Sequence, residues 1–188
     1  GVACMWYGIG NTVIANPSTM RGSLRCTPER GAHLFLYNGA QEIGQGTATI
    51  MPQMFADAVG LPVASVEQLM GDTDRTADAG KSSASRQTFV SGNATKAAGE
   101  DLRRQLLGAL GATEPATLSL DGAVLSARTG ERTHRLDLRT LAPLALVRQL
   151  PIAGTVVYFA GSPQRPRFQE AKLERTGRCP SLPSSLTA

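Results

Sequence analysis

The sequence predicts an α+β fold with mixed sheets, hairpins and two principal helices. Two stretches have the apolar spacing of amphipathic helices, and several short apolar runs have the character of strands. The dipeptides Asn38-Gly39 and Asp121-Gly122 are typical of hairpin turns, and strands do not alternate strictly with helices. This mixture is typical of α+β rather than α/β proteins.

The first helix is predicted in residues 48–62, ATIMPQMFADAVGLP, after the apolar run HLFLYNGAQEI. Four apolar residues recur on one face: Ile50, Met54, Phe55 and Ala58. Gly60 suits the left-handed position that ends a helix, and Pro62 lies beyond it. Pro52 falls in the expected first turn, where proline is tolerated. The residues VEQLM that follow predict a short strand, which leads into the polar loop GDTDRTADAGKSS.

The second and longer helix is predicted from about Ser85 to Leu110, with Glu100 and Arg104 as an i,i+4 ion pair. Its apolar positions recur at helical spacing: Val90, Ala94, Ala97, Ala98, Leu102, Leu106 and Leu110. A hairpin then follows around Asp121-Gly122 in TLSLDGAVLSA.

The C-terminal part is predicted to contain a short helix in Leu141 to Leu150 and a strand in GTVVYFAG. Residues 161–188 show no apolar periodicity and contain four prolines, which indicates an extended tail. We therefore divide the chain into a region 1–160 and a tail 161–188.

Composition limits the class of protein. Hydrophobic residues make up 41% and charged residues 18% of the 188 residues, as in ordinary soluble domains, and no apolar run of eighteen residues predicts a membrane span. Cys4, Cys26 and Cys179 are widely spaced, which argues against a disulfide framework and a cysteine metal site and favours a reducing compartment. We expect the cytoplasm, with the periplasm as the alternative. The first residues lack an initiating Met and a basic leader, which is consistent with a chain that begins inside a larger protein.

Three common kinds of site are disfavoured. A P-loop would need glycine at position 75, where Arg75 stands before Gly80-Lys81-Ser82. An EF-hand counted from Asp72 would need glycine at Ala77 and glutamate at Ser83, so the aspartates of this loop are expected to cap turns. The net charge of +4 is concentrated in the C-terminal part, which has few aromatics and no nucleic-acid motif, so we expect no nucleic-acid partner.

The two histidines, His33 and His134, have no serine or aspartate partner in evident register. Structural or exposed roles are therefore favoured over acid–base catalysis.

An ordered series of motifs indicates a family. Gly39-Ala40, Glu42-Ile43-Gly44-Gln45-Gly46 and Gly60-Leu61-Pro62 are followed by GDTD, SASRQT and Gly92-Asn93-Ala94. This series resembles the molybdenum-binding large subunit of the xanthine oxidase family of molybdenum hydroxylases, and it is most similar to bacterial aldehyde oxidoreductases. The resemblance covers about residues 1–160.

The resemblance implies molybdopterin as the cofactor, usually as the cytosine dinucleotide. In GQGT, two glycines let the backbone approach a flat ligand, and the helix that follows offers free N–H groups to an anion. SASRQT opens the second helix in the same way, with hydroxyl donors and the permanent charge of Arg86. The expected cofactor-binding residues are Ile43, Gly44, Gln45, Gly46, Thr47, Ser83, Ala84, Ser85, Arg86, Gln87 and Thr88.

The resemblance also implies oxidation of an aldehyde or an N-heterocycle with water as the oxygen source. Electrons would leave through [2Fe-2S] clusters carried by other parts of the enzyme. No protein ligand to molybdenum is expected, because the pterin dithiolene holds the metal. No catalytic residue is expected in this chain either, since the general-base glutamate belongs to a segment that is absent here and Glu42 is not its equivalent. Trp6 and Tyr7 either border the substrate approach or lie in the core.

The chain is expected to work with the remaining molybdenum-binding and iron–sulfur parts of the enzyme, and to be inactive alone. It could be one piece of a split subunit, a fragment or a truncated product. The rival hypothesis is a non-catalytic assembly module that retains the fold without the cofactor.

Overall fold

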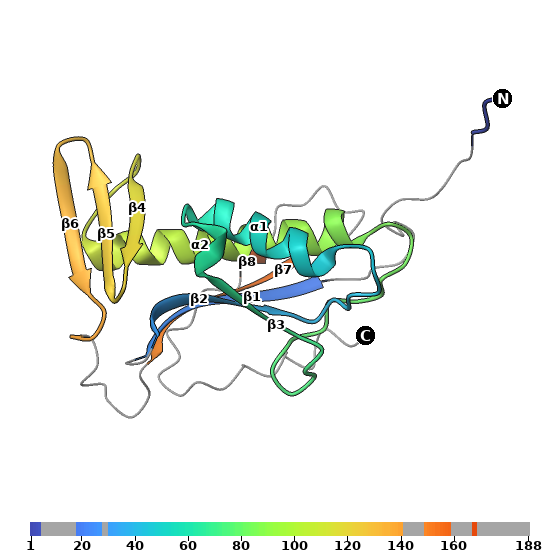
Figure 1. Ribbon diagram of the computed structural model, residues 1–188, viewed down its shortest axis with the longest axis horizontal. Helices are drawn as coiled ribbons and strands as arrows, with labels where there is room; N and C mark the ends of the chain where they lie inside the picture. The colour runs from blue at the N-terminus through green and yellow to red at the C-terminus, as the bar shows by residue number, and fades with distance from the viewer. Residues whose placement is uncertain (5–17, 28–29, 141–148, 159–166, 169–188) are drawn as a thin grey trace.

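The computed structural model describes residues 1–4, 18–27, 30–140, 149–158 and 167–168 (Figure 1). A mixed five-stranded sheet has the strand order β3-β2-β1-β7-β8. Its strands are β1 (Ser18–Thr27), β2 (Gly31–Asn38), β3 (Val66–Met70), β7 (Gln149–Tyr158) and β8 (Arg167–Phe168). β2 and β3 run parallel and the other neighbours antiparallel. Together with the helices, this arrangement confirms the α+β class.

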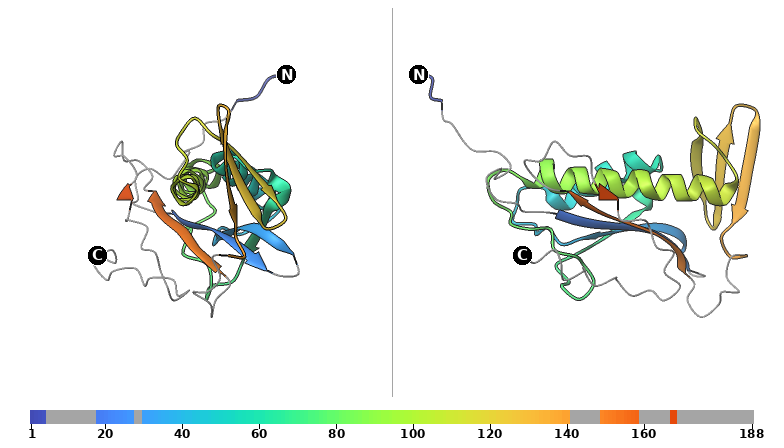
Figure 2. Two further views of the ribbon diagram at one scale, coloured as in Figure 1. Left: turned by 90° about the vertical axis from the view of Figure 1, so that its left-hand side faces the viewer. Right: turned by 180° about the vertical axis from the view of Figure 1, so that it is seen from behind.

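Two helices cover one face of this sheet (Figures 1 and 2). They are α1 (Thr47–Val59) and α2 (Gly92–Leu110), and a π-helical turn, η2 (Gln87–Ser91), precedes α2. The helices run parallel (Figure 1). Met54, in the middle of α1, lies beside Gly92 at the start of α2, and Arg103, farther along α2, bonds the carbonyl of Val59 at the end of α1. Both N-termini therefore lie at the same end of the molecule.

The Phe55 ring joins the two helices to the sheet. A Cβ at Gly22 of β1 would overlap this ring. A Cβ at Gly99 of α2 would lie 2.6 Å from the Cβ of Ala58 and 3.3 Å from the Phe55 ring. The ring therefore occupies the space that Gly22 leaves open, and Gly99 lets α2 approach Ala58 and Phe55 of α1 closely.

A second, antiparallel sheet lies at the C-terminal end of α2 (Figure 1). It contains β4 (Thr117–Asp121), β5 (Val124–Thr129) and β6 (Arg132–Asp137) in that order. Leu118, Leu125 and Ala127 from this sheet belong to the same buried cluster as Leu107 and Leu110 of α2. One apolar core therefore runs from the five-stranded sheet through the helices into the small sheet.

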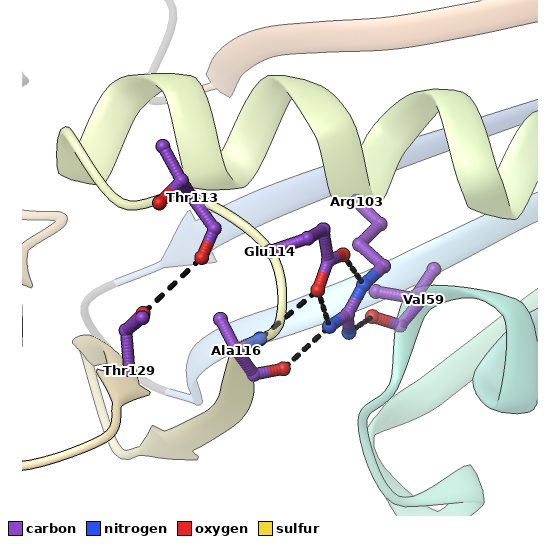
Figure 3. Close-up of polar contacts among 6 residues, drawn as sticks. All are labelled: Val59, Arg103, Thr113, Glu114, Ala116 and Thr129. Atoms are coloured by element: carbon purple, nitrogen blue, oxygen red, sulfur yellow. Dashed lines mark hydrogen bonds and ion pairs between the residues drawn. The ribbon is translucent and has the colours of Figure 1, made fainter.

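Arg103 fastens this junction (Figure 3). Its guanidinium donates to the carbonyl of Val59 at 2.9 Å, to that of Ala116 at 2.5 Å and to the carboxylate of Glu114. The hydrogen bond from Arg103 holds the pKa of the Glu114 carboxyl below its usual value. Thr129 of β5 adds a bond to the carbonyl of Thr113 at 3.2 Å. The end of α1, the middle of α2 and the start of β4 are thus tied together.

The first predicted helix is confirmed, and Gly60 ends it in the left-handed conformation with φ 82°. The buried face of this helix differs from the predicted one, because the buried residues are Met51, Phe55, Ala56 and Val59. Ile50, Met54 and Ala58 are only half-buried. Because the helix begins at Thr47, Pro52 lies in its second turn and not in its first.

All seven apolar positions predicted for the second helix are buried. Its start is later than predicted, because Ala84 and Ser85 have positive φ angles of 56° and 49° and the helical turns begin at Gln87. The predicted Glu100–Arg104 pair is replaced by Lys96–Glu100 at 3.8 Å and by Asp101–Arg104.

One of the two predicted hairpin turns is confirmed and the other is wrong. Asp121-Gly122 does turn β4 into β5, with Gly122 at φ 55°. Asn38-Gly39 instead ends β2, after which the chain passes through α1 and a short 3-10 turn, η1 (Val63–Ser65), and returns as the parallel strand β3. The Asn38 Oδ1 accepts the N–H of Ala40 at 2.8 Å, which makes a local turn without a hairpin.

The predicted helix of Leu141 to Leu150 is wrong at its end, because Gln149 and Leu150 begin β7. Residues 141–148 lie outside the described residues, as do Trp6, Tyr7, Cys179 and most of the predicted 161–188 tail. Among the described helices, none is long and apolar enough to cross a membrane.

Candidate functional site

Two loops meet at the carboxyl ends of β2 and β3. The 39–46 loop follows β2 and the 71–86 loop follows β3, and Asn38 and Met70 are paired at the ends of these strands. The loops touch, since a Cβ at Gly39 would overlap the carbonyl oxygen of Ala77 and one at Gly71 would lie 3.6 Å from the Gln41 side chain. The first turns of α1 and η2 leave from these loops. Both predicted groups of site residues therefore lie at the same end of the sheet.

Glu42 organises the 39–46 loop. Its carboxylate accepts the N–H groups of Gly44 at 2.7 Å, Gly46 at 3.0 Å and Ala48 at 2.7 Å. These bonds, first that of Ala48 and then that of Gly46, hold the pKa of the Glu42 carboxyl below its usual value. A negative group at a helix N-terminus is favourable, and here the chain supplies that group itself. The N–H groups that the sequence assigned to a ligand anion are thus partly occupied by Glu42.

Gln45 ties the same loop together with its side-chain amide. The amide oxygen accepts the N–H of Ile43 at 2.7 Å, and the amide nitrogen donates to the Gln41 carbonyl and the Thr47 hydroxyl, both at 2.8 Å. Gln45 is exposed and Ile43 is 74% exposed, an uncommon position for a large apolar side chain. The loop therefore presents a flat amide and an apolar side chain to its surroundings.

Two glycines of this loop leave room for a ligand. Gly44 and Gly46 have φ angles of 101° and 87°, which side-chain-bearing residues rarely adopt. A Cβ at either position would meet no atom within 4 Å. The surrounding protein does not fill this space, so a flat ligand could contact the backbone here.

Arg86, which the sequence assigned to a ligand anion, lies inside the protein. Its side chain is fully buried, and its guanidinium donates to the carbonyls of Ala79 at 2.9 Å and Lys81 at 2.7 Å. Burial lowers the pKa of Arg86, and the nearby Asp78 carboxylate opposes this effect. Arg86 holds the backbone of the 71–86 loop and does not present its charge to a surface ligand.

Gln87 continues this internal support. Its amide nitrogen donates to the Lys81 carbonyl at 3.1 Å and to the Ser82 hydroxyl at 3.2 Å, while its oxygen accepts the hydroxyl of Ser91. The Ser91 hydroxyl is also 2.9 Å from that of Ser18 at the start of β1. A chain of hydrogen bonds therefore runs from the loop into the five-stranded sheet.

The remaining residues of this group face outward. Ser83, Ser85 and Thr88 are exposed, and Ala84 is half-buried. The left-handed conformations of Ala84 and Ser85 are uncommon for residues with a Cβ, and such conformations concentrate at functional sites. The exposed hydroxyls stand at the start of the helical turns, where backbone N–H groups favour anions.

Two of the three aspartates of the 71–86 loop, Asp72 and Asp78, cap turns as predicted. Asp72 accepts the N–H of Asp74 at 3.1 Å, and Asp78 accepts the N–H of Gly80 at 2.7 Å. Within the described ranges, no three His, Cys, Asp or Glu side chains form a group that could hold a metal ion.

The histidines lie apart from the two loops. His33 is inside β2, where its Nε2 is 2.7 Å from the Arg30 carbonyl oxygen, and His134 is in β6.

The predicted site residues fall into two classes. The outward-facing members are Ile43, Gly44, Gln45, Gly46, Ser83, Ala84, Ser85 and Thr88. Thr47, Arg86 and Gln87 are buried and shape the loops. Sequence reasoning missed the capping role of Glu42, although an acidic residue shortly before a helix is a recognisable signal for it.

Comparisons with known proteins identify a family. The family described as the molybdopterin cofactor-binding domain matches residues 1–175. The putative xanthine dehydrogenase molybdenum-binding subunit of Escherichia coli K12 is 39% identical over 108 residues, which cover 57% of this chain and 14% of that protein. A xanthine dehydrogenase molybdenum-binding subunit of Escherichia coli O157:H7 gives the same values. The matched part is thus about a seventh of the length of these relatives.

Solved structures show the same fold at lower identity. Reconstituted CO dehydrogenase from Oligotropha carboxidovorans has a TM-score of 0.51 at 21% identity, with 78% of this chain and 18% of that chain covered. Quinoline 2-oxidoreductase from Pseudomonas putida 86 has a TM-score of 0.50 at 16% identity, with 77% and 19% covered. With the family match over most of its length, this chain belongs to the molybdopterin cofactor-binding domain family.

Proposed function

We propose that this chain is the part of a molybdenum-dependent hydroxylase in which the 39–46 and 71–86 loops contact the molybdopterin. Family membership over residues 1–175 carries this proposal, and 39% identity to a molybdenum-binding subunit supports it. The meeting of both loops at one end of the sheet gives the contact a single location. When bound, the cofactor would supply the oxidation of an aldehyde or an N-heterocycle with water as the oxygen source.

The two loops fit different parts of such a cofactor. Open space beside Gly44 and Gly46, together with the exposed Gln45 amide, suits one face of a flat pterin. The exposed hydroxyls of Ser83, in the loop before η2, and of Thr88, in its first turn, suit phosphate oxygens. Because Glu42 already occupies N–H groups at the start of α1, the anionic part of the cofactor is assigned to the 71–86 loop.

The buried residues position these contacts. Arg86 and Gln87 fix the carbonyls of the 71–86 loop, so that its exposed hydroxyls keep their places before the cofactor arrives. Such preorganisation reduces the entropy lost on binding. Thr47 is buried at the start of α1 and accepts a hydrogen bond from Gln45, which orients that amide.

The finer features of the assembly belong to this proposal as well. The cofactor form would be the cytosine dinucleotide, and [2Fe-2S] clusters on other parts of the enzyme would carry electrons away. The general-base glutamate and the remaining molybdenum-binding region would also come from those parts. The cytoplasm is the proposed compartment, with the periplasm as the alternative.

The test measures molybdenum per chain by mass spectrometry, in protein purified natively with its partners. Ser83→Ala removes an exposed hydroxyl of the 71–86 loop, and Ser119→Ala makes the matched change on the exposed side of β4. We expect near-stoichiometric molybdenum in the wild type and in Ser119→Ala, and a lower content in Ser83→Ala and in Gln45→Ala.

Each outcome has a distinct meaning. Equal metal in all variants would overturn the assignment of the loops but not the cofactor. A folded native assembly without molybdenum would favour the rival function, a non-catalytic module, which is otherwise disfavoured by the family match.

A further inference from the structure

The starts of α1 and η2, which lie at the same end of the molecule, differ in charge. The only charged residue of 40–48 (AQEIGQGTA) is Glu42. The charged residues of 80–88 (GKSSASRQT) are Lys81 and Arg86, both basic. Each stretch leads into helical turns whose first N–H groups favour an anion. The same backbone property is therefore combined with opposite charges at the two places.

The Glu42 carboxylate closes the start of α1. Its Oε1 accepts the N–H groups of Gly44 at 2.7 Å and Gly46 at 3.0 Å, and its Oε2 accepts that of Ala48 at 2.7 Å. Residues 41–45, which include Glu42, are all exposed, so a ligand could reach this loop. An anion arriving here would meet a negative charge, together with N–H groups that already have an acceptor.

The start of η2 is not closed in this way by the residues that the structure describes. Its first turn contains no acidic residue, and the side chain of Arg86, which precedes it, makes no capping bond. The nearest acid in the sequence is Asp78, whose carboxylate accepts the N–H of Gly80 at 2.7 Å. Lys81 is exposed, and its carbonyl is held by Arg86 at 2.7 Å and by Gln87 at 3.1 Å. An anion at this loop would therefore meet an exposed ammonium group on a supported backbone.

The surface beside Glu42 suits an uncharged group instead. A Cβ at Gly44 or Gly46 would meet no atom within 4 Å, and the Gln45 amide is exposed. The Ile43 side chain is 74% exposed. These residues offer space, hydrogen bonds and an apolar contact, but no positive charge. A flat neutral ring could therefore lie where a phosphate group would be repelled.

We propose that Glu42 determines the orientation of the cofactor by keeping its anionic part away from the start of α1. This inference rests on the function proposed above and extends it. With the carboxylate in place, the uncharged part of the ligand lies on the 39–46 loop. The anionic part is directed to Lys81 and to the exposed hydroxyls of the 71–86 loop. Specificity of this kind depends on a repulsive group as much as on attractive contacts.

The experiment locates bound inorganic phosphate from the backbone amide shifts of the full ¹⁵N-labelled chain, by NMR in about 0.1 M salt. In the wild type, phosphate should shift the amides of residues 83–88 and leave those of Gly44, Gly46 and Ala48 in place. In Glu42→Ala these three amides should shift as well. Their apparent affinity for phosphate should rise at least about tenfold, because one like charge is removed and three N–H donors are released. A merely structural role of Glu42 could disturb the loop but would not create a phosphate-dependent shift there.

Asp57→Ala is the matched control, because it removes the same charge from the exposed side of α1 without releasing an N–H of the loop. Asp57 lies nine residues beyond Ala48, about 13 Å along the helix, so its charge is largely screened at this salt concentration. Phosphate binding at the three amides should therefore change by less than about twofold. Glu42→Gln is a second variant that keeps an acceptor in the loop. It should show the same new shifts, at a weaker affinity than Glu42→Ala.

Two outcomes would overturn the inference. The three amides could shift in the wild type as much as those of residues 83–88, or they could stay unshifted in both Glu42 variants. Either result can occur while the native assembly contains molybdenum, so failure of this inference is distinguishable from failure of the proposed function. A native assembly without molybdenum would instead contradict the proposed function, whatever the phosphate shifts are.

Discussion

In the 39–46 loop a carboxylate gathers backbone N–H groups, whereas in the 71–86 loop a guanidinium gathers backbone carbonyls. Glu42 lies on the exposed side of its loop, and Arg86 is fully buried within its own. Both loops contain glycines and precede a helix, so their sequences look alike. The difference shows that a charged residue in such a loop can hydrogen-bond the backbone of the loop itself and is not necessarily available to a ligand.

The largest effect is expected from Arg86→Ala. The substitution removes the donor to the Ala79 carbonyl and one of the two donors to the Lys81 carbonyl, and it creates a cavity. The free energy of unfolding should therefore fall by about 3 kcal/mol. Urea unfolding at neutral pH measures this change. Arg139→Ala, which removes an exposed arginine paired with Asp137, should change stability by less than about 0.5 kcal/mol. A loss below about 1 kcal/mol for Arg86→Ala would contradict its role as the internal support of the loop.

A smaller loss is expected from Gly39→Ala, at the contact between the two loops. The new Cβ would overlap the Ala77 carbonyl oxygen and force the loops apart, which should cost about 2 kcal/mol. Gly108→Ala is the matched control, because Gly108 of α2 has open space around it. That variant should gain about 0.5–1 kcal/mol, since alanine favours a helix. Equal stability of the two variants would show that the two loops are not in close contact at Gly39.

The role of Glu42 predicts a dependence on acid. The folded state lowers the pKa of this carboxyl, so its stabilising contribution is complete above the ordinary glutamate pKa of about 4.3 and is lost as pH falls through the lower folded value. Glu42→Gln should therefore be less stable than the wild type at pH 7, and the difference should shrink by pH 3. Thermal unfolding across this range measures it, with Glu131→Gln at the exposed β5–β6 turn as the control. A difference that does not change with pH would exclude the carboxylate as the cause.

The smallest effect on stability is expected from Gln45→Ala, within about 0.5 kcal/mol, because the side chain is exposed. The local effect should be clear, since the N–H of Ile43 loses its acceptor. Hydrogen exchange at Ile43 should become faster, while exchange in α2 stays the same. Unchanged exchange at Ile43 would show that Gln45 does not hold the loop.

Much of the fold could be predicted because burial imposes a period on the sequence. Six apolar positions of α2, Val90 of η2, the end of α1 at Gly60 and the Asp121-Gly122 turn all followed from local patterns. β1 and β6 were missed, because STMRGSLRCT and RTHRLD contain charged residues where a typical strand would be apolar. The hairpin predicted at Asn38-Gly39 was wrong. Asn38 does form a local turn, but the direction of the chain after that turn depends on the pairing of β2 with β3.

The sequence singled out the two loops of the proposed site but not the roles of their residues. The ordered motifs identified both loops, and the pairing of β2 with β3 explains why they meet. Whether Arg86 faces a ligand or the protein interior depends on tertiary burial, which local sequence does not determine. The left-handed conformations of Ala84 and Ser85 were also missed, since neither residue type announces a positive φ.

The packing of Phe55 against Gly22 and Gly99 limits which substitutions relatives of this domain can accept. A larger residue at Gly22 would be accepted only with a smaller one at position 55. At Gly99 the Cβ of Ala58 and the backbone carbonyl oxygen of Phe55 set the limit instead. Relatives should therefore vary at positions 22 and 55 as a pair, while the loop ends vary independently. The distance between the helix layer and the sheet would then stay the same among relatives, while their loops change and bind different ligands.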